Sequence, residues 1–369
     1  MAEVSSDDPI LDGLRAAIES YADPYLHQTL REAGALRELT AADGGYVARI
    51  VLGLPVGGYQ ETFAAELGAH VRAAGQTAPL RVEVQSQIRV HAVQRPLQPL
   101  AKIKNIVAVA SGKGGVGKST VAVNLALAWA RQGARVGVLD ADIYGPSQPL
   151  MLGLAGEQPV SHDGKHIEPL KKHGVEAMSI GFLVDADQPM VWRGPMVTQA
   201  LSQLLAETRW GELDYLVVDM PPGTGDIQLT LAQRVPVAGA VIVTTPQDIA
   251  LADAGKGLKM FEKVSVPVLG IVENMSVHVC SQCGHVEHIF GEGGGVRMAA
   301  QYGVRLLGEL PLDVRIREEA DGGQPTVLAA PDSPRAKAYF DMARRTAGAL
   351  AGRPLDHSGV FPKIVVEKK

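Results

Sequence analysis

The amino-acid sequence predicts an α/β protein in which a doubly wound, mostly parallel sheet follows a small N-terminal α/β domain. From Asn105 onward, short apolar runs of strand length alternate with helical stretches. Strands that are apolar throughout are typical of a parallel sheet covered by helices on both faces. A segment rich in proline and basic residues precedes this region. The 369 residues are enough for two domains of about 100–200 residues each.

The small domain is predicted to span residues 1–93. Apolar residues at helical spacing predict helices over Pro9–Ser20 and Gln60–Ala73. Three strands are predicted from apolar runs and turn residues: Leu36–Leu39, Tyr46–Pro55 and Leu80–Ile88. Residues 94–104 contain two prolines and three basic residues, which predicts a linker.

The larger domain is predicted to span residues 105–353, and residues 354–369 form a peripheral tail. Its predicted strands are Ile106–Ala110, Val136–Leu139, Leu213–Asp219, Ala240–Thr244, Val268–Val272 and Val304–Leu310. Helices are predicted between them, among others over Lys118–Gln132 and Ile249–Lys263.

Composition and charge restrict the class of protein. The formal net charge of −5 gives no general attraction to nucleic acid or to acidic membranes. The first residues lack the basic start and apolar stretch of a signal peptide, and no apolar run reaches the roughly 18 residues of a membrane helix. We therefore expect a cytoplasmic protein that binds neither nucleic acid nor membrane. There, Cys280 and Cys283 would remain thiols that can bind a metal.

A glycine-rich loop joins the first strand of the larger domain to its first helix. Residues 112–119 fit the pattern G-x-x-x-x-G-K-[S/T] in the strand–loop–helix context that it requires. Glycines allow backbone N–H groups to turn toward phosphate oxygens, and the helix N-terminus adds a favourable dipole. The loop predicts a P-loop nucleotide hydrolase that binds ATP with Mg²⁺. The expected nucleotide contacts come from Gly112, Gly114, Gly115, Val116, Gly117, Lys118, Ser119 and Thr120.

Three acids stand at the ends of predicted strands, where parallel sheets bind ligands. Asp219 ends an apolar strand and is expected to contact Mg²⁺ directly or through water, together with the Ser119 hydroxyl. Asp142 is the candidate for positioning the attacking water, and Asp140 for supporting the magnesium site. Helix capping or a solvated loop position is the alternative for such acids.

Two lysines of the loop are candidate catalytic residues. Lys118 can reach the β- and γ-phosphates. Lys113 is a second lysine that the plain motif does not require. Its side chain either lies in solvent or reaches a nucleotide in a facing subunit, where it would neutralise developing charge as arginine fingers do.

The two cysteines form a Cys-x-x-Cys pair, with Gly284 directly after them. Thiolates at this spacing can chelate one metal ion or two corners of a cluster. A four-thiolate site needs four cysteines, so either two chains share one site or the pair recruits other ligands. A zinc site with His285 and His288, a redox pair, and two packed thiols are the alternatives.

Several motifs together resemble one family. The loop 112–120 resembles the deviant Walker A motif of the MinD/ParA-type ATPases, the SIMIBI class. The sequence also contains Leu139-Asp-Ala-Asp-Ile-Tyr-Gly-Pro-Ser147, Trp192-Arg-Gly-Pro-Met196, Asp219-Met-Pro-Pro-Gly-Thr-Gly-Asp226 and Cys280-Ser-Gln-Cys283. With these, residues 103–350 resemble the Mrp/ApbC branch, the iron–sulfur cluster carrier ATPases. The N-terminal domain resembles the MIP18-like (DUF59) domain, but no cysteine occurs in its segment Leu54–Tyr59.

The resemblance implies a homodimer with nucleotide between its subunits, in which Lys113 acts across the interface. It further implies a [4Fe–4S] cluster that bridges the two subunits through Cys280 and Cys283. The cluster would be passed to apo iron–sulfur proteins, with cluster assembly factors as further partners. Asn274 matches the position that recognises the adenine edge, and Pro311 and Asp313 lie where base contacts are also made.

Two other functions remain open at this point. One is a MinD/ParA-like switch in spatial organisation, which would need a membrane-binding helix or a basic patch for DNA. The other is a zinc-stapled regulatory ATPase.

Overall fold

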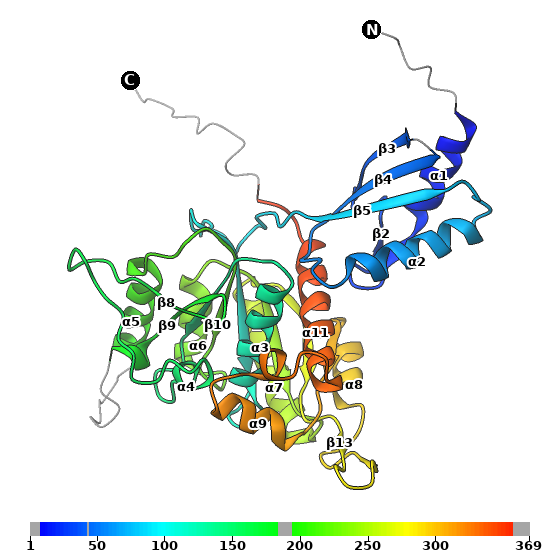
Figure 1. Cartoon of the computed structure of the whole chain (residues 1–369). Helices are drawn as coiled ribbons and strands as arrows, with labels where there is room; N and C mark the ends of the chain where they lie inside the picture. The colour runs from blue at the N-terminus through cyan, green and yellow to red at the C-terminus, as the bar shows by residue number, and fades with distance from the viewer. Residues whose placement is uncertain (1–7, 43, 184–193, 357–369) are drawn as a thin grey trace, which may run out of the picture.

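The computed structural model describes residues 8–42, 44–183 and 194–356 (Figure 1). Its largest element is an eight-stranded sheet with the order β15-β12-β11-β6-β10-β7-β9-β8. Neighbouring strands are parallel except for β8 and β9, which are antiparallel. The strand bounds are β6 Ile103–Ser111, β7 Val136–Asp140, β8 Leu170–Lys172, β9 Val175–Ser179, β10 Leu213–Asp219, β11 Val237–Thr244, β12 Val268–Glu273 and β15 Leu306–Glu309. The predicted fold class is confirmed.

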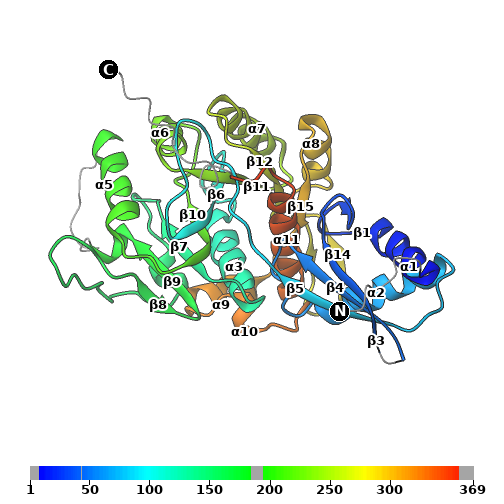
Figure 2. The same ribbon diagram turned by 90° about the horizontal axis from the view of Figure 1, so that it is seen from above.

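Helices cover both faces of this sheet (Figure 2). On one face lie α3 (Lys118–Arg131), α4 (Gln148–Met151), α9 (Val314–Asp321), α10 (Thr326–Ala329) and α11 (Pro334–Ala351). On the other lie α5 (Gly194–Glu207), α6 (Asp226–Arg234), α7 (Asp248–Lys263) and α8 (Gly294–Tyr302). Because both faces are covered, the central strands β6, β10 and β11 are buried almost throughout, which explains why their sequences are continuously apolar.

The N-terminal region forms a separate three-stranded sheet. Strands β3 (Leu36–Ala42) and β4 (Gly45–Leu52) are antiparallel, and β5 (Leu80–Ser86) is parallel to β4. Helices α1 (Pro9–Ser20) and α2 (Gln60–Ala73) accompany it, and β1 (Ala22–Asp23) pairs with β2 (Gln28–Thr29). The crossover from β4 to β5 runs through α2, as a parallel pair requires.

The two regions meet along α11. The Tyr25 hydroxyl donates to the Asp341 carboxylate at 2.9 Å, and the guanidinium of Arg344 lies over the rings of Tyr25 and Tyr59. At Gly348 a Cβ atom would lie 2.1 Å from the carbonyl oxygen of Tyr25, so only glycine permits this approach. The N-terminal sheet is therefore docked on the last helix of the larger domain.

Among the described helices, none combines the length and the hydrophobicity needed to cross a bilayer.

Candidate nucleotide and metal site

The glycine-rich loop lies between β6 and α3 at the carboxyl edge of the sheet. Gly115 and Gly117 have φ values of 81° and 82°, in the left-handed region that favours glycine. At Gly112 a Cβ atom would lie 2.2 Å from the backbone carbonyl carbon of Asp253 in α7, so this glycine allows the loop to pack against that helix. The loop conformation therefore depends on its glycines, as the sequence predicts.

The Lys118 ammonium is the centre of a buried polar cluster. Its Nζ donates to Asp219 Oδ1 at 2.5 Å and to Ser119 Oγ at 3.1 Å, and it lies 3.9 Å from Asp142 Oδ2. The lysine is 6% exposed and Asp219 is fully buried. In this state the lysine charge is balanced by the carboxylate at the end of β10. The structure thus brings together three side chains that the sequence assigned to nucleotide and magnesium, along with Asp142.

Asp140 holds the chain segment that follows β7. Its carboxylate accepts hydrogen bonds from the backbone N–H groups of Asp142, Ser147 and Gln148, and from the Ser179 hydroxyl. Burial, with the nearby Asp219 carboxylate as second cause, raises the pKa of Asp140 to about 7. Asp140 thereby holds residues 142–148 at the end of β7.

Asp142 lies at the mouth of the cluster and is 9% exposed. Burial raises its pKa, and the Lys118 ammonium opposes this effect. Lys113 is half-buried, and its backbone carbonyl accepts a hydrogen bond from the Ser111 hydroxyl at 2.9 Å. The catalytic roles expected for both residues remain predictions.

Gln148, at the start of α4, is a site residue that was not predicted from the sequence. Its Nε2 donates to Asp219 Oδ2 at 2.8 Å and to the Ser119 carbonyl oxygen at 3.1 Å. Gln148 therefore ties the end of β10 to the first turn of α3. The only signal in the sequence is its place shortly after Asp142, at the carboxyl end of a strand.

Of the three candidate base-binding residues, Asn274 contacts the glycine-rich loop. Asn274 follows β12, and its Nδ2 donates to the Val116 carbonyl oxygen at 2.9 Å. Asp313 accepts a hydrogen bond from the Arg315 N–H and caps α9. Pro311 is half-buried. Recognition of adenine by these three residues stays a prediction.

The cysteines lie on a hairpin formed by β13 (His278–Val279) and β14 (Val286–Glu287). The Cys280 N–H donates to the His285 carbonyl oxygen, and the Gly284 N–H donates to that of Cys280. Backbone N–H groups of Cys283 and Gln282, in that order, lower the pKa of the Cys280 thiol. Cys283 is exposed and Cys280 is half-buried. The pair is thus presented at the surface, and the pKa of one of its thiols is lowered.

The histidines near the pair have other contacts. His288 Nδ1 lies 2.9 Å from the Ser276 carbonyl oxygen, and His285 Nε2 lies 3.7 Å from Glu287. In the part of the chain that the structure describes, no group of three or more His, Cys, Asp or Glu side chains is arranged to hold a metal ion. The zinc site within one chain is therefore not formed here.

The motif residues Trp192 and Arg193 lie outside the described residues.

A family profile matches residues 102–347, and its description is ParA: NUBPL iron-transfer P-loop NTPase. An iron–sulfur cluster carrier protein of Pseudomonas fragi is 64% identical over 264 residues, covering 71% of this chain and 92% of that protein. A protein of the same description from Synechocystis is 44% identical over 344 residues, covering 92% of this chain and 98% of its own length. The iron–sulfur cluster transfer protein NUBPL of Dictyostelium discoideum is 53% identical over 243 residues, 66% of this chain and 75% of that protein.

Solved structures agree with this assignment. A nucleotide-binding protein of Archaeoglobus fulgidus in complex with ADP superposes with a TM-score of 0.57 at 40% identity, covering 65% of this chain and 93% of the other. The cell division ATPase MinD of Pyrococcus furiosus has a TM-score of 0.50 at 24% identity, which supports the fold alone; it covers 65% of this chain and 97% of its own. The profile covers more than half of the chain, and the carrier proteins align along most of it. The chain belongs to the ParA-type, NUBPL-like iron-transfer P-loop NTPases, the family of the iron–sulfur cluster carrier proteins.

Proposed function

We propose that this member of the iron–sulfur cluster carrier family hydrolyses ATP and carries a [4Fe–4S] cluster between two copies of itself. The cluster is delivered to apo iron–sulfur proteins, with cluster assembly factors as partners. The observation that carries this proposal is the surface hairpin with its two thiols, because each chain supplies half of the four thiolates that such a cluster takes.

The surroundings of the thiols suit a shared site. Backbone N–H groups that lower the pKa of Cys280 also stabilise negative sulfur ligands. Three apolar side chains flank the pair, Val279, Val286 and Ile289, and each is more than half exposed. Exposed apolar side chains that gather in one place are typical of a protein–protein contact. A second copy of the hairpin would cover them and complete the ligand set.

The residues around Lys118 fit a magnesium–nucleotide site. The Lys118 ammonium lies within 3.1 Å of oxygens from both Ser119 and Asp219, so these two oxygens already surround a positive charge. Hydroxyl and carboxylate oxygens are the ligands that Mg²⁺ accepts in P-loop proteins. With ATP bound, Lys118 would contact the β- and γ-phosphates. Ser119 and Asp219 would then hold the metal ion, which would neutralise charge at the phosphates.

The remaining steps of hydrolysis are assigned to two residues. Asp142 orients the attacking water, since its carboxylate lies at the mouth of the cluster and close to Lys118. Lys113 of one copy neutralises charge at the nucleotide of the other. Asn274 recognises adenine from its place against the loop. Cytoplasmic location and the lack of nucleic-acid and membrane partners stay predictions, as does the MIP18-like nature of the N-terminal domain.

Anaerobic reconstitution with iron and sulfide tests the cluster. The unmodified chain is expected to develop the brown colour and visible absorption of a [4Fe–4S] cluster, and Cys283→Ser is expected to lose it. Ser281→Ala is the matched control, because it changes the same turn without removing a thiol. A colourless protein with one zinc per chain would contradict the proposal.

Mixing two variants tests the role of Lys113 across the dimer. Lys113→Ala lacks the lysine that serves the partner, and Asp142→Asn lacks the group that orients water in its own site. Each alone is expected to be nearly inactive. In a mixed dimer, the site with intact Asp142 faces an intact Lys113, so ATP hydrolysis should return. If the mixture is no more active than its two components, Lys113 does not act across the dimer.

A further inference from the structure

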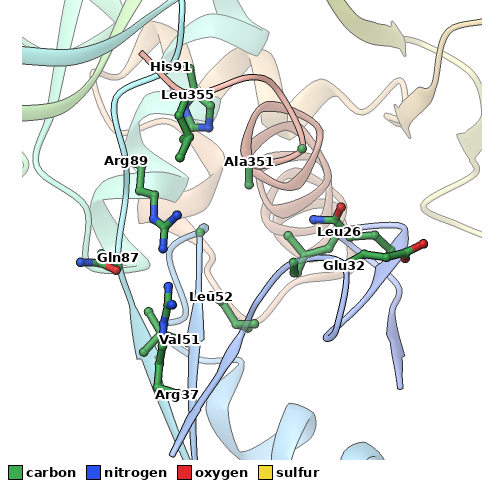
Figure 3. Close-up of a pocket in the computed structure, with 14 residues that line it drawn as sticks. Leu26, Glu32, Arg37, Val51, Leu52, Gln87, Arg89, His91, Ala351 and Leu355 are labelled. Atoms are coloured by element: carbon green, nitrogen blue, oxygen red, sulfur yellow. The ribbon is translucent and has the colours of Figure 1, made fainter. Parts of the chain in front are cut away.

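We propose that a cavity between the N-terminal sheet and the end of α11 binds a small organic anion, an oxyanion group carried on a short hydrocarbon. The cavity has a volume of about 240 Å³, and none of its lining residues belongs to the P-loop (Figure 3). That volume is below the roughly 300–1,000 Å³ of pockets for drug-sized ligands, so its occupant is a small metabolite.

Two guanidinium groups converge on this cavity. Arg37 and Arg89 both line it, and their side chains point toward one another along one wall (Figure 3). Like charges that face each other repel, and an anion placed between them removes that cost. Arginine pairs are suited to carboxylate and phosphate groups, because each guanidinium can donate two parallel hydrogen bonds.

The backbone directs Arg37 to this place. The register between β3 and β4 shifts between Leu36, opposite Ile50, and Glu38, opposite Arg49, so Arg37 is the extra residue of a bulge. A bulge turns a side chain out of the regular alternation of the strand. The irregularity therefore places a charged group at the cavity.

Neither arginine forms an ion pair with an acid among the residues that the structure describes. The neighbouring Arg49, by contrast, pairs with Glu38 at 2.6 Å and with Glu83 at 3.8 Å. The sheet thus supplies carboxylates to the arginine outside the cavity and none to the two that line it.

Among the described residues, a single acid lines the cavity, Glu32, and it is engaged elsewhere. Glu32 accepts hydrogen bonds from the backbone N–H and the hydroxyl of Thr29, at 2.7 Å and 2.9 Å. These bonds lower its pKa. In Figure 3 its side chain lies across the cavity from the arginine wall. Glu32 is therefore held by Thr29 and forms no ion pair with either arginine.

The rest of the lining is largely apolar or neutral. Apolar side chains line the cavity opposite the arginines: Leu26, Leu52, Ala351 and Leu355. Burial, reinforced by the charge of Arg89, lowers the pKa of His91, which disfavours a further positive charge at this wall. A hydrated inorganic ion gains nothing from such a wall, whereas the hydrocarbon of an organic anion does.

The test is isothermal titration calorimetry on the full chain. The P-loop is itself an anion site, so the chain is first saturated with Mg²⁺ and ADP. Glutarate and propyl phosphate are the probes, and inorganic phosphate serves as the oxyanion without hydrocarbon. Glutarate and propyl phosphate distinguish a carboxylate from a phosphate head group.

Arg37→Gln and Arg89→Gln are the variants. Arg15→Gln is the control, since Arg15 is an exposed arginine on α1 outside the cavity and its loss changes the net charge equally. Both cavity arginines are exposed, and thermal unfolding checks that each variant is folded. We expect saturable binding of one organic probe, weakened about tenfold or more in either cavity variant, because each loses charge-assisted hydrogen bonds.

Three results would overturn the inference. The first is no saturable binding of either organic probe up to about 10 mM. The second is equal affinity for inorganic phosphate, which would leave the apolar wall without a role. The third is binding that both cavity variants retain, or that Arg15→Gln weakens as much as they do.

Discussion

Replacing Gln148 by methionine tests how the polar cluster of the site is held. Gln148 is 1% exposed and donates two hydrogen bonds, one to the Asp219 carboxylate and one to the Ser119 carbonyl oxygen. Methionine keeps the length and volume of the side chain and removes both donors. A hydrogen bond to a charged group contributes about 1.5–3 kcal/mol and a neutral one about 0.5–1.5 kcal/mol. Gln148 Oε1 has no hydrogen-bond partner among the described residues, so its removal offsets part of this loss. Gln148→Met is therefore expected to lower the free energy of unfolding by about 1–3 kcal/mol.

Gln228→Met is the matched control. Gln228 is also 1% exposed, but neither polar atom of its side chain has a hydrogen-bond partner among the described residues. Removing buried polar atoms without partners relieves a desolvation cost, so the free energy of unfolding of Gln228→Met should equal or slightly exceed that of the unmodified chain. Urea unfolding of the nucleotide-free chain, followed by the fluorescence of the buried Trp129 and Trp210, measures both.

A second measurement separates site geometry from stability. Ser119 and Asp219 lose their common anchor in Gln148→Met, so the Mg²⁺ concentration for half-maximal ATP hydrolysis should rise. Gln228→Met should leave it unchanged. Equal destabilisation by both substitutions, or an unchanged Mg²⁺ requirement in Gln148→Met, would refute this account of the cluster.

Three further predictions concern the loop, the domain junction and catalysis. Gly112→Ala should unfold the loop region and abolish nucleotide binding, because the new Cβ meets the backbone of Asp253. Gly114→Ala should keep the fold, because no atom lies within 4 Å of the added carbon; thermal unfolding and ADP titration compare the two variants. Burial lowers the pKa of His91, so below about pH 6.5 the unfolded chain binds more protons than the folded chain, and the free energy of unfolding falls as the pH is lowered. His91→Gln should reduce that fall in urea titrations between about pH 8 and pH 5, and an identical pH profile for the variant would contradict this prediction. Lys113→Ala should bind ATP normally but hydrolyse it about 10³-fold more slowly, a loss of the size seen when an arginine finger is removed. A hydrolysis rate within a factor of about two of that of the unmodified chain would show that Lys113 has no catalytic role.

The local motifs of the larger domain were predictable from sequence because burial and phosphate binding each restrict which residue types can occupy them. The continuous apolar runs correspond to β6, β7, β10, β11 and β12, since burial on both faces favours apolar side chains along most of each strand. The glycine-rich loop was recognisable because phosphate binding needs its backbone. The sequence pattern alone places Lys118 and Asp219 in one site, because both stand at the carboxyl edge of a parallel sheet.

Other elements depended on tertiary structure that no local pattern reveals. Gln148 lies 29 residues after Ser119 and 71 residues before Asp219, and only the strand order brings the three together. Strand β8 is three residues long and has two lysines, so its pairing with β9 decides its conformation. The bulge that directs Arg37 into the cavity is likewise a property of strand register.

Helix α11 was not predicted, although residues at its start carry a local signal. Ser333 accepts a hydrogen bond from the Ala336 N–H, and Pro334 occupies the first helical position. Both are typical of a helix start. The long helix that joins the two regions could therefore have been predicted from residues 333–336.

Native mass spectrometry of the anaerobically reconstituted chain tests the central claim most directly. It counts iron and sulfide on each oligomer. We expect four irons and four sulfides only on the dimer, and none on a dimer of Cys283→Ser. Iron retained by a monomer, or by chains without the two thiols, would contradict the shared cluster and leave a nucleotide hydrolase alone.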